Sequence, residues 1–198
     1  MPSPEKFKQT LEDSKLSQEI INDIYHGFEE VKTKTSKKIK FDYFKQAIEV
    51  MNLKIPKGKV KEILELNACC KSGVCEKKSK EFALKNCNLN INEKIKIISS
   101  RPYLNMGSAE LDDNMSLIIN AVSYRSQDKF ECVCPTISKI KKDYSMPLKY
   151  CYCCGGHFKY HYETMLDLKM KLIEIISSPH DTDGQKPCVF RFEFLSED

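Results

Sequence analysis

The spacing of the apolar residues changes near the middle of the chain, and this change constrains the fold more than any other feature. In residues 1–105 apolar side chains recur every three or four positions, the period of an amphipathic helix. From residue 106 onward, short apolar runs and strict alternation are typical of strands. We therefore predict an α+β fold, in which a helical N-terminal half is followed by a small antiparallel sheet with a helix and a C-terminal hairpin. Residues 1–105 would form a helical region and residues 106–198 a cysteine-rich α/β region, and the two could also form one compact domain.

The helical half divides into short amphipathic segments. Ser17 is suited to cap the second segment. Pro56 ends the segment that precedes Pro56 in the sequence. The apolar residues that define the faces are Phe7 and Leu11; Ile20, Ile21, Ile24, Tyr25, Phe28 and Val31; Phe41, Phe44, Ala47, Ile48 and Met51; Val60, Ile63 and Leu64; Phe82 with Leu84; and Ile95, Ile97 and Ile98.

In the second half, residues 101–114 are predicted to form a loop and to contain the boundary between the regions. Gly155 and Gly156 are interpreted as a tight turn into a helix that begins near Gly156 and carries Phe158, Tyr162, Met165 and Leu166. The predicted strands are Leu117–Val122, Lys129–Cys134, a segment in which Leu168, Met170 and Leu172 alternate with lysines, and a final strand with Cys188, Phe190, Phe192 and Phe194 on one side.

Charge and hydropathy exclude several classes of function. The amino terminus is polar and no apolar run reaches the length of a signal peptide or a membrane span, which predicts a cytoplasmic protein with no membrane partner. The net charge of +4, from 32 basic and 28 acidic residues, is near balance. Lysine-rich runs at 32–40 and 54–61 lack the aromatics that stack on bases, so we expect no nucleic-acid partner.

Ten cysteines in a reducing compartment indicate metal binding or redox chemistry rather than disulfides. Residues two apart on a strand point to the same face, so Cys132 with Cys134, and Cys151 with Cys153, would each offer two thiolates to one side. Sulfur ligation of zinc stabilises small peptides by about 10–16 kcal/mol, against about 2–4 for a disulfide. We therefore predict a site for zinc or an iron–sulfur cluster, two cofactors that the spacing does not distinguish. The expected ligands are Cys132, Cys134, Cys151 and Cys153, with Cys70 and Cys75 as further candidates.

A thiol-dependent hydrolase or redox enzyme is the alternative. Thiolates at Cys153 and Cys154 would lie beside the positive end of the following helix, which favours the charged, nucleophilic form. His157 is the candidate base, and it shares a helix face with His161, although packing explains both histidines better. A third interpretation is that the cysteines only pack a core.

The order of the cysteine motifs carries a resemblance. A cysteine cluster after a helix is followed by Cys132-Val133-Cys134-Pro135, by Cys151-Tyr152-Cys153-Cys154-Gly155-Gly156 and by Gly184 four residues before Cys188. From residue 66 onward the chain resembles a family of uncharacterised cysteine-rich bacterial proteins. The C-terminal half of that family is similar to vinyl reductase-type small-molecule-binding domains and to the aminothiazoline carboxylate hydrolase family.

The resemblance implies an α/β ligand-binding fold with a thiol site and a small-molecule ligand, thus a binding or sensing module, and it implies no particular reaction. The chain departs from the pattern at two places. Four residues separate Cys70 from Cys75 where a tighter pair is expected, which leaves open whether Cys69 or Cys70 matches, and His157 replaces an aromatic residue. The oligomeric state stays open.

Overall fold

The computed structural model describes residues 3–69, 71–101, 104, 106–121, 124–126, 128–132, 134–138, 140 and 146–196. An α+β fold is confirmed, with helices first, then a small antiparallel sheet, a helix and a C-terminal hairpin. The helices of the first half are α1 (Pro4–Asp13), α2 (Gln18–Tyr25), α3 (Lys37–Lys54), α4 (Lys57–Leu66), α5 (Gly73–Lys85) and α6 (Ile91–Ser100). The second half contains β1 (Ser108–Leu111), β2 (Leu117–Asn120), β3 (Tyr124–Ser126), β4 (Lys129–Glu131), η2 (Leu148–Cys151), α7 (Tyr152–Leu166), β5 (Met170–Ser177) and β6 (Val189–Phe194).

Helix ends in the first half follow local side-chain chemistry. Ser17 caps α2 as predicted, because its hydroxyl accepts a hydrogen bond from the Ile20 amide. α2 ends at Tyr25, however, so Phe28 and Val31 lie beyond it rather than within it. Gly27, with φ of 77°, reverses the chain after the helix and returns Val31 to the core. The prediction that Leu84 belongs to an apolar face is wrong, since Leu84 is 78% exposed.

The sheet has the strand order β1-β2-β6-β5, with every neighbouring pair antiparallel. Its inner face is buried and is formed by Leu117, Ile119, Met170, Leu172, Phe190 and Phe192. The predicted C-terminal hairpin is confirmed by the pairing of β5 with β6. The prediction of a loop throughout residues 101–114 is wrong, because Ser108–Leu111 forms β1 and pairs with β2.

Hairpin β5–β6 contains irregular register near Leu172 and again near Ile175. Ile173 and Glu174 are both exposed, so the inward side of the strand passes from Leu172 to Ile175. This extra residue is the mark of a β-bulge, which bends and twists a strand. The bulge explains why the alternation that begins at Met170 does not continue in phase to Ser177.

α7 begins at Tyr152, earlier than the predicted start near Gly156, and follows η2 directly. Gly155 and Gly156 therefore lie inside the helix and do not form the predicted turn. A Cβ atom on Gly155 would lie 2.4 Å from a methyl carbon of Leu172, and one on Gly156 would lie 2.4 Å from the carbonyl oxygen of Glu65. The two glycines allow α7 to approach both the sheet and α4 closely.

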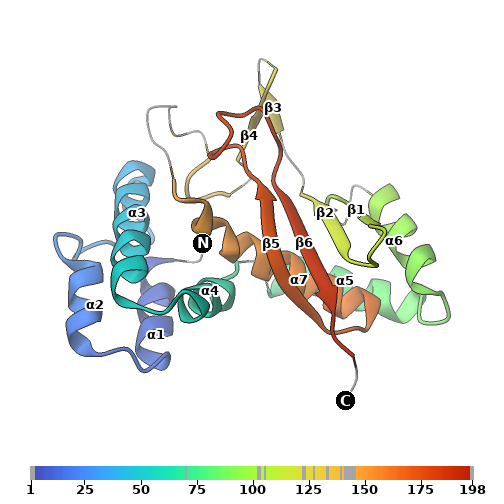
Figure 1. Cartoon of the computed structure of the whole chain (residues 1–198), viewed down its shortest axis with the longest axis horizontal. Helices are drawn as coiled ribbons and strands as arrows, with labels where there is room; N and C mark the ends of the chain where they lie inside the picture. Colours follow the sequence, from blue (N-terminus) through green and yellow to red (C-terminus); the bar gives the residue numbers. More distant parts are fainter. Residues whose placement is uncertain are drawn as a thin grey trace.

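The buried apolar residues form two clusters that meet at α7. One contains residues of α1–α4 together with Ile137, Met146, Tyr150 and Cys153; the other contains residues of α5, α6, α7 and the sheet. Figure 1 shows this arrangement, with α1–α4 at one end of the molecule, α5 and α6 toward the other, and α7 between them. Helices α5 and α6 thus pack with the sheet, while the predicted division of the chain at residue 105 stays a prediction.

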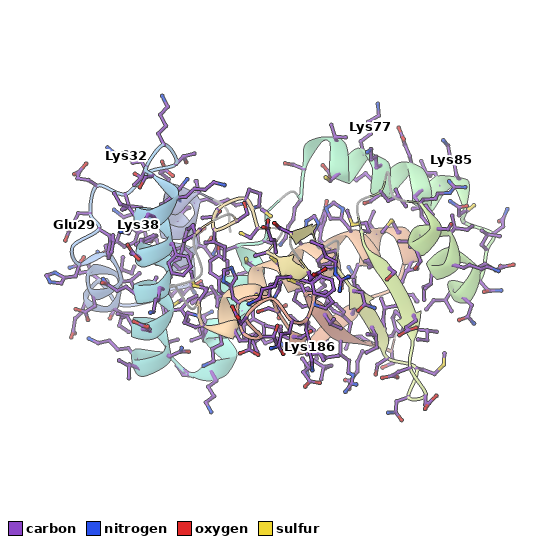
Figure 2. All side chains as sticks on the ribbon, turned by 90° about the horizontal axis from the view of Figure 1, so that it is seen from above. Glu29, Lys32, Lys38, Lys77, Lys85 and Lys186 are labelled. Carbon is purple, nitrogen blue, oxygen red and sulfur yellow. The ribbon has the colours of Figure 1, made fainter. Side chains whose placement is uncertain are left out.

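Charged side chains cover both ends of the molecule. In Figure 2, Lys32 and Lys38 lie at the end formed by α1–α3, and Lys77 and Lys85 lie on α5 at the opposite end. Of the helices that the structure describes, none combines the length and apolar composition needed to span a membrane.

Candidate thiol site

Six cysteines from three separate segments gather between the two apolar clusters, and we call them the thiol cluster. Cys134 and Cys153 are buried in the first apolar cluster, with Cys132 packed against it. Cys151 and Cys188 are buried in the second, and Cys154 contacts both. All cysteines among the described residues are free thiols. The thiol cluster therefore lies where the helical end of the molecule meets the sheet.

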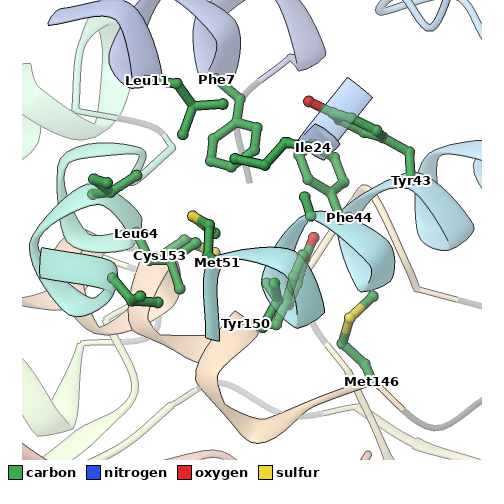
Figure 3. Close-up of a cluster of buried hydrophobic side chains, with 14 of the residues drawn as sticks. Phe7, Leu11, Ile24, Tyr43, Phe44, Met51, Leu64, Met146, Tyr150 and Cys153 are labelled. Carbon is green, nitrogen blue, oxygen red and sulfur yellow. The ribbon is translucent and has the colours of Figure 1, made fainter. Parts of the chain in front are cut away.

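None of the four expected ligands lies on a strand, so the prediction that strand alternation pairs them is wrong: β4 ends at Glu131, before Cys132 and Cys134, and Cys151 and Cys153 lie in helical segments. Cys151 ends η2 and Cys153 lies in the first turn of α7. Successive helical residues are rotated by about 100°, so side chains two positions apart point in nearly opposite directions. Cys151 accordingly packs on the sheet side, while Figure 3 shows Cys153 in the cluster that contains Met51 and Leu64.

Four members of the thiol cluster interact electrostatically in every pairing: Cys132, Cys151, Cys153 and Cys188. Burial, followed by the charges of neighbouring thiols, raises the pKa of Cys132 and Cys151, and it raises the pKa of Cys188 to about 12. Without a cation, these three thiols are neutral near pH 7. A cation placed among them would remove the mutual repulsion and favour thiolates.

Cys134 is held by the residues around it. Its sulfur lies 3.2 Å from the hydroxyl of Tyr150, and its amide donates to the sulfur of Cys132 over 3.4 Å. Tyr150 is fully buried, and burial raises its pKa well above the ordinary value. The phenol therefore stays protonated and fixes Cys134 beside η2.

Cys153 and Cys154 form a hydrogen-bonded pair at the start of α7. The hydrogen bond from the Cys154 thiol lowers the pKa of Cys153 and raises the pKa of Cys154, and it outweighs the burial that opposes ionisation of Cys153. Cys153 is thus the first thiol of the pair to lose its proton. It is also completely buried, so a substrate could reach it only after the helical end moves away from α7.

The remaining predicted ligands are placed differently. Cys75 lies on α5, where neighbouring Glu76 and Ser79 contact Tyr160 and His161 of α7, and the structure does not place it in the thiol cluster. Cys70 lies outside the described residues. Cys188 is the member that sequence reasoning left out. Its alternation with Phe190 and Phe192 already indicated an inward-facing side chain before β6.

His157 and His161 pack against each other on α7, with ring centroids 4.6 Å apart. The Nδ1 atom of His157 donates to the carbonyl of Cys69 over 3.0 Å, and Nδ1 of His161 lies 2.8 Å from the Ser79 hydroxyl. Because that hydroxyl donates to the Cys75 carbonyl, it accepts from His161. Both rings therefore carry their proton on Nδ1.

The environment makes His157 a poor base. Burial, and then the neighbouring His161, lower its pKa to about 4. Among the described residues, no hydrogen bond joins His157 to Cys153 or Cys154. The ring is thus neutral at pH 7, and a general base works best with a pKa near the working pH.

In the described part of the chain, no three histidine, cysteine or acidic side chains are arranged so that they could hold a metal ion as they stand. Comparisons of the chain with protein-family models, with curated proteins and with solved structures find no match. The resemblance to the cysteine-rich bacterial family therefore stays a prediction.

Proposed function

We propose that this protein is a thiolate metal-binding module whose cofactor, zinc or an iron–sulfur cluster, is held by Cys132, Cys151, Cys153 and Cys188. The observation that carries the proposal is the gathering of the buried or half-buried thiols of the thiol cluster between the two apolar clusters, and the electrostatic interaction of these four thiols in every pairing supports it. Sulfur-only ligands suit either cofactor. The set keeps three of the four ligands expected from the sequence, with Cys188 in place of Cys134, whose sulfur contacts the Tyr150 hydroxyl.

Binding requires rotation of side chains, because Cys151 and Cys153 point to different apolar clusters. A cysteine side chain has a single rotatable bond that moves its sulfur, so such a change is local. The structural consequence is larger, since the cofactor would tie η2 and α7 to the segments before β6 and after β4. Metal binding would therefore stabilise the contact between the two ends of the molecule, and a small molecule bound near the cofactor could be sensed through that contact.

The direct test is anaerobic purification followed by elemental analysis, acid-labile sulfide determination and visible absorption. We expect near-stoichiometric metal in the wild type, loss of it in Cys153→Ala and Cys188→Ala, and retention in Cys87→Ala. Cys87 is the matched control because its side chain is exposed beyond α5. Alanine is used because a buried free cysteine behaves as a small apolar residue.

A second measurement separates loss of the metal from loss of the fold. Cd²⁺ added to metal-free protein should give a thiolate-to-metal absorption band and raise the melting temperature of the wild type and Cys87→Ala. The two cluster variants should keep helical circular dichroism and lose the band. Wild-type protein that is folded, metal-free and unable to produce the band would exclude the proposal.

The thiol-enzyme alternative is favoured by one observation, the hydrogen bond that lowers the pKa of Cys153. It requires that one thiol of the metal-free protein react with iodoacetamide much faster than the others at pH 7, and that this thiol be Cys153 or Cys154. If the thiols are instead labelled in the order of their solvent exposure, with Cys87 first, the thiol-enzyme alternative is excluded.

A further inference from the structure

The connection between β5 and β6 is folded on itself and is tied to β4. The amides of Asp181 and Thr182 each donate to the Ser178 carbonyl over 3.2 Å. The Gly184 carbonyl accepts a hydrogen bond of 2.8 Å from the Phe130 amide of β4. The connection is therefore an ordered turn that its own backbone holds on the sheet side of the molecule.

The imidazole of His180 brings this connection into contact with the helical end. Its ring centroid lies 6.3 Å from that of Phe41 in the N-terminal half of α3. Phe41 is fully buried and belongs to the first apolar cluster. His180 thus links a turn of the sheet to a helix on the other side of the thiol cluster.

The Nε2 atom of His180 is shielded from solvent and has no hydrogen-bond partner within the described residues. A neutral imidazole tolerates this environment because one of its nitrogens is only an acceptor, whereas the imidazolium donates from both nitrogens. Protonation would therefore place a charged donor where nothing accepts its hydrogen bond. A buried charge without a partner is costly, so the protonated ring must leave the contact to reach water.

The charges on the two elements do not compensate a charge on His180. The charged residues of α3 and of the connection that are nearest in sequence to the two rings are Lys37, Lys38, Asp42, Lys45, Asp181 and Asp183. Lys37 donates to the Ser138 carbonyl over 3.3 Å, and Asp183 pairs with Lys129. Burial lowers the pKa of His180, and in the part of the chain that the structure describes no neighbouring charge opposes this shift.

We propose that His180 is a pH-sensitive switch, which holds the connection between β5 and β6 against α3 while neutral and releases it when protonated. The pKa of the ring in contact with Phe41 lies below the ordinary value of 6.5, to which it returns on release. The contact is therefore complete above pH 6.5 and is lost as the pH falls through the lowered pKa. Release removes one contact between the helical end and the sheet, and it does not depend on the proposed metal.

NMR of the full chain between pH 7.5 and pH 5, with a chelator present, tests the inference. We expect a nuclear Overhauser effect between the rings of His180 and Phe41 at pH 7.5 and its loss once the ring resonances of His180 show protonation. Hydrogen exchange, expressed as protection factors to remove its intrinsic pH dependence, should show at least a ten-fold loss of protection at the Thr182 amide.

Matched substitutions assign the effect to one ring. His180→Gln cannot gain a charge, so its Thr182 amide should keep its protection at pH 5 within two-fold of the value at pH 7.5. His26→Gln removes the same titratable group from an exposed position after α2 and should behave as the wild type. If His180→Gln does not fold, the ring contact of the wild type decides alone. Equal loss of protection in the wild type and His180→Gln, or a ring contact that persists after His180 is protonated, would overturn the inference.

Discussion

Gly156→Ala should destabilise the protein far more than the same change at other helical glycines. The new Cβ would lie 2.4 Å from the carbonyl oxygen of Glu65 and 2.9 Å from its Cα. Unbonded carbon and oxygen atoms normally stay more than about 3.2 Å apart, so α4 and α7 must separate by roughly 1 Å. Overpacking of this kind costs about 1–3 kcal/mol. The upper end applies here, because the atoms met by the new Cβ belong to the Glu65 backbone, which cannot rotate away as a side chain can. We expect a loss of about 3 kcal/mol.

Two other glycines provide the comparison. In Gly155→Ala the Cβ meets a methyl carbon of Leu172 at 2.4 Å, but that side chain can adopt another rotamer, so we expect a loss of about 1 kcal/mol. Gly58 is helical and has no atom within 4 Å of an added Cβ. Gly58→Ala should therefore stabilise the protein by up to about 1 kcal/mol through helix propensity.

Urea unfolding followed by circular dichroism at 222 nm measures the series. A chelator should be present throughout, so that the comparison does not depend on the proposed metal. With a slope of about 2 kcal/mol per molar urea, Gly156→Ala should lower the midpoint by about 1.5 M. If Gly156→Ala were as stable as the wild type, or if Gly155→Ala were the more damaging change, the close contact between α4 and α7 would be refuted.

Two further predictions concern stability at single side chains. His157 has a folded-state pKa of about 4 against an ordinary value of 6.5, so its contribution is complete above pH 6.5 and is lost as the pH falls toward 4. At about 1.4 kcal/mol per pKa unit, the loss of stability reaches about 3 kcal/mol. His157→Asn should flatten this part of the pH–stability curve. An unchanged curve would contradict the lowered pKa of His157. Asn90→Ala should lower the free energy of unfolding in urea by about 1 kcal/mol, because Asn90 and Glu93 form a capping box at α6. Asn92→Ala, at a neighbouring exposed position, is the control. An equal effect of both substitutions would refute the capping role.

The period of the apolar residues was sufficient to predict the helices of the first half and the hairpin β5–β6, since burial of one face requires that spacing. It was insufficient for β1, which has four residues and depends on pairing with β2. Such a contact joins residues distant in the chain, and local spacing does not encode it. For the same reason, Gly155 and Gly156 suggested a turn, although the atoms that require them belong to Leu172 and Glu65.

The candidate site was predictable in composition and not in geometry. The sequence clustering pointed to Cys132, Cys134, Cys151, Cys153 and Cys154, which lie in or against the two apolar clusters, while metal binding by them stays a prediction. The strand assumed for Cys151 and Cys153 was wrong, because the helix starts before the glycines rather than after them. Cys188 was missed because it stands alone in sequence, although its inward direction followed from the alternation of β6.

The first apolar cluster also has a consequence for synthesis on the ribosome. Most of its residues belong to α1–α4 and end by Leu64, whereas Met146, Tyr150 and Cys153 complete it (Figure 3). Translation at roughly 5–20 residues per second places the completing residues several seconds behind the helices. During that interval the nascent helices expose an apolar face with nothing to cover it. We expect a ribosome-bound chain ending before η2 to recruit chaperones, and a chain extended past α7 to release them.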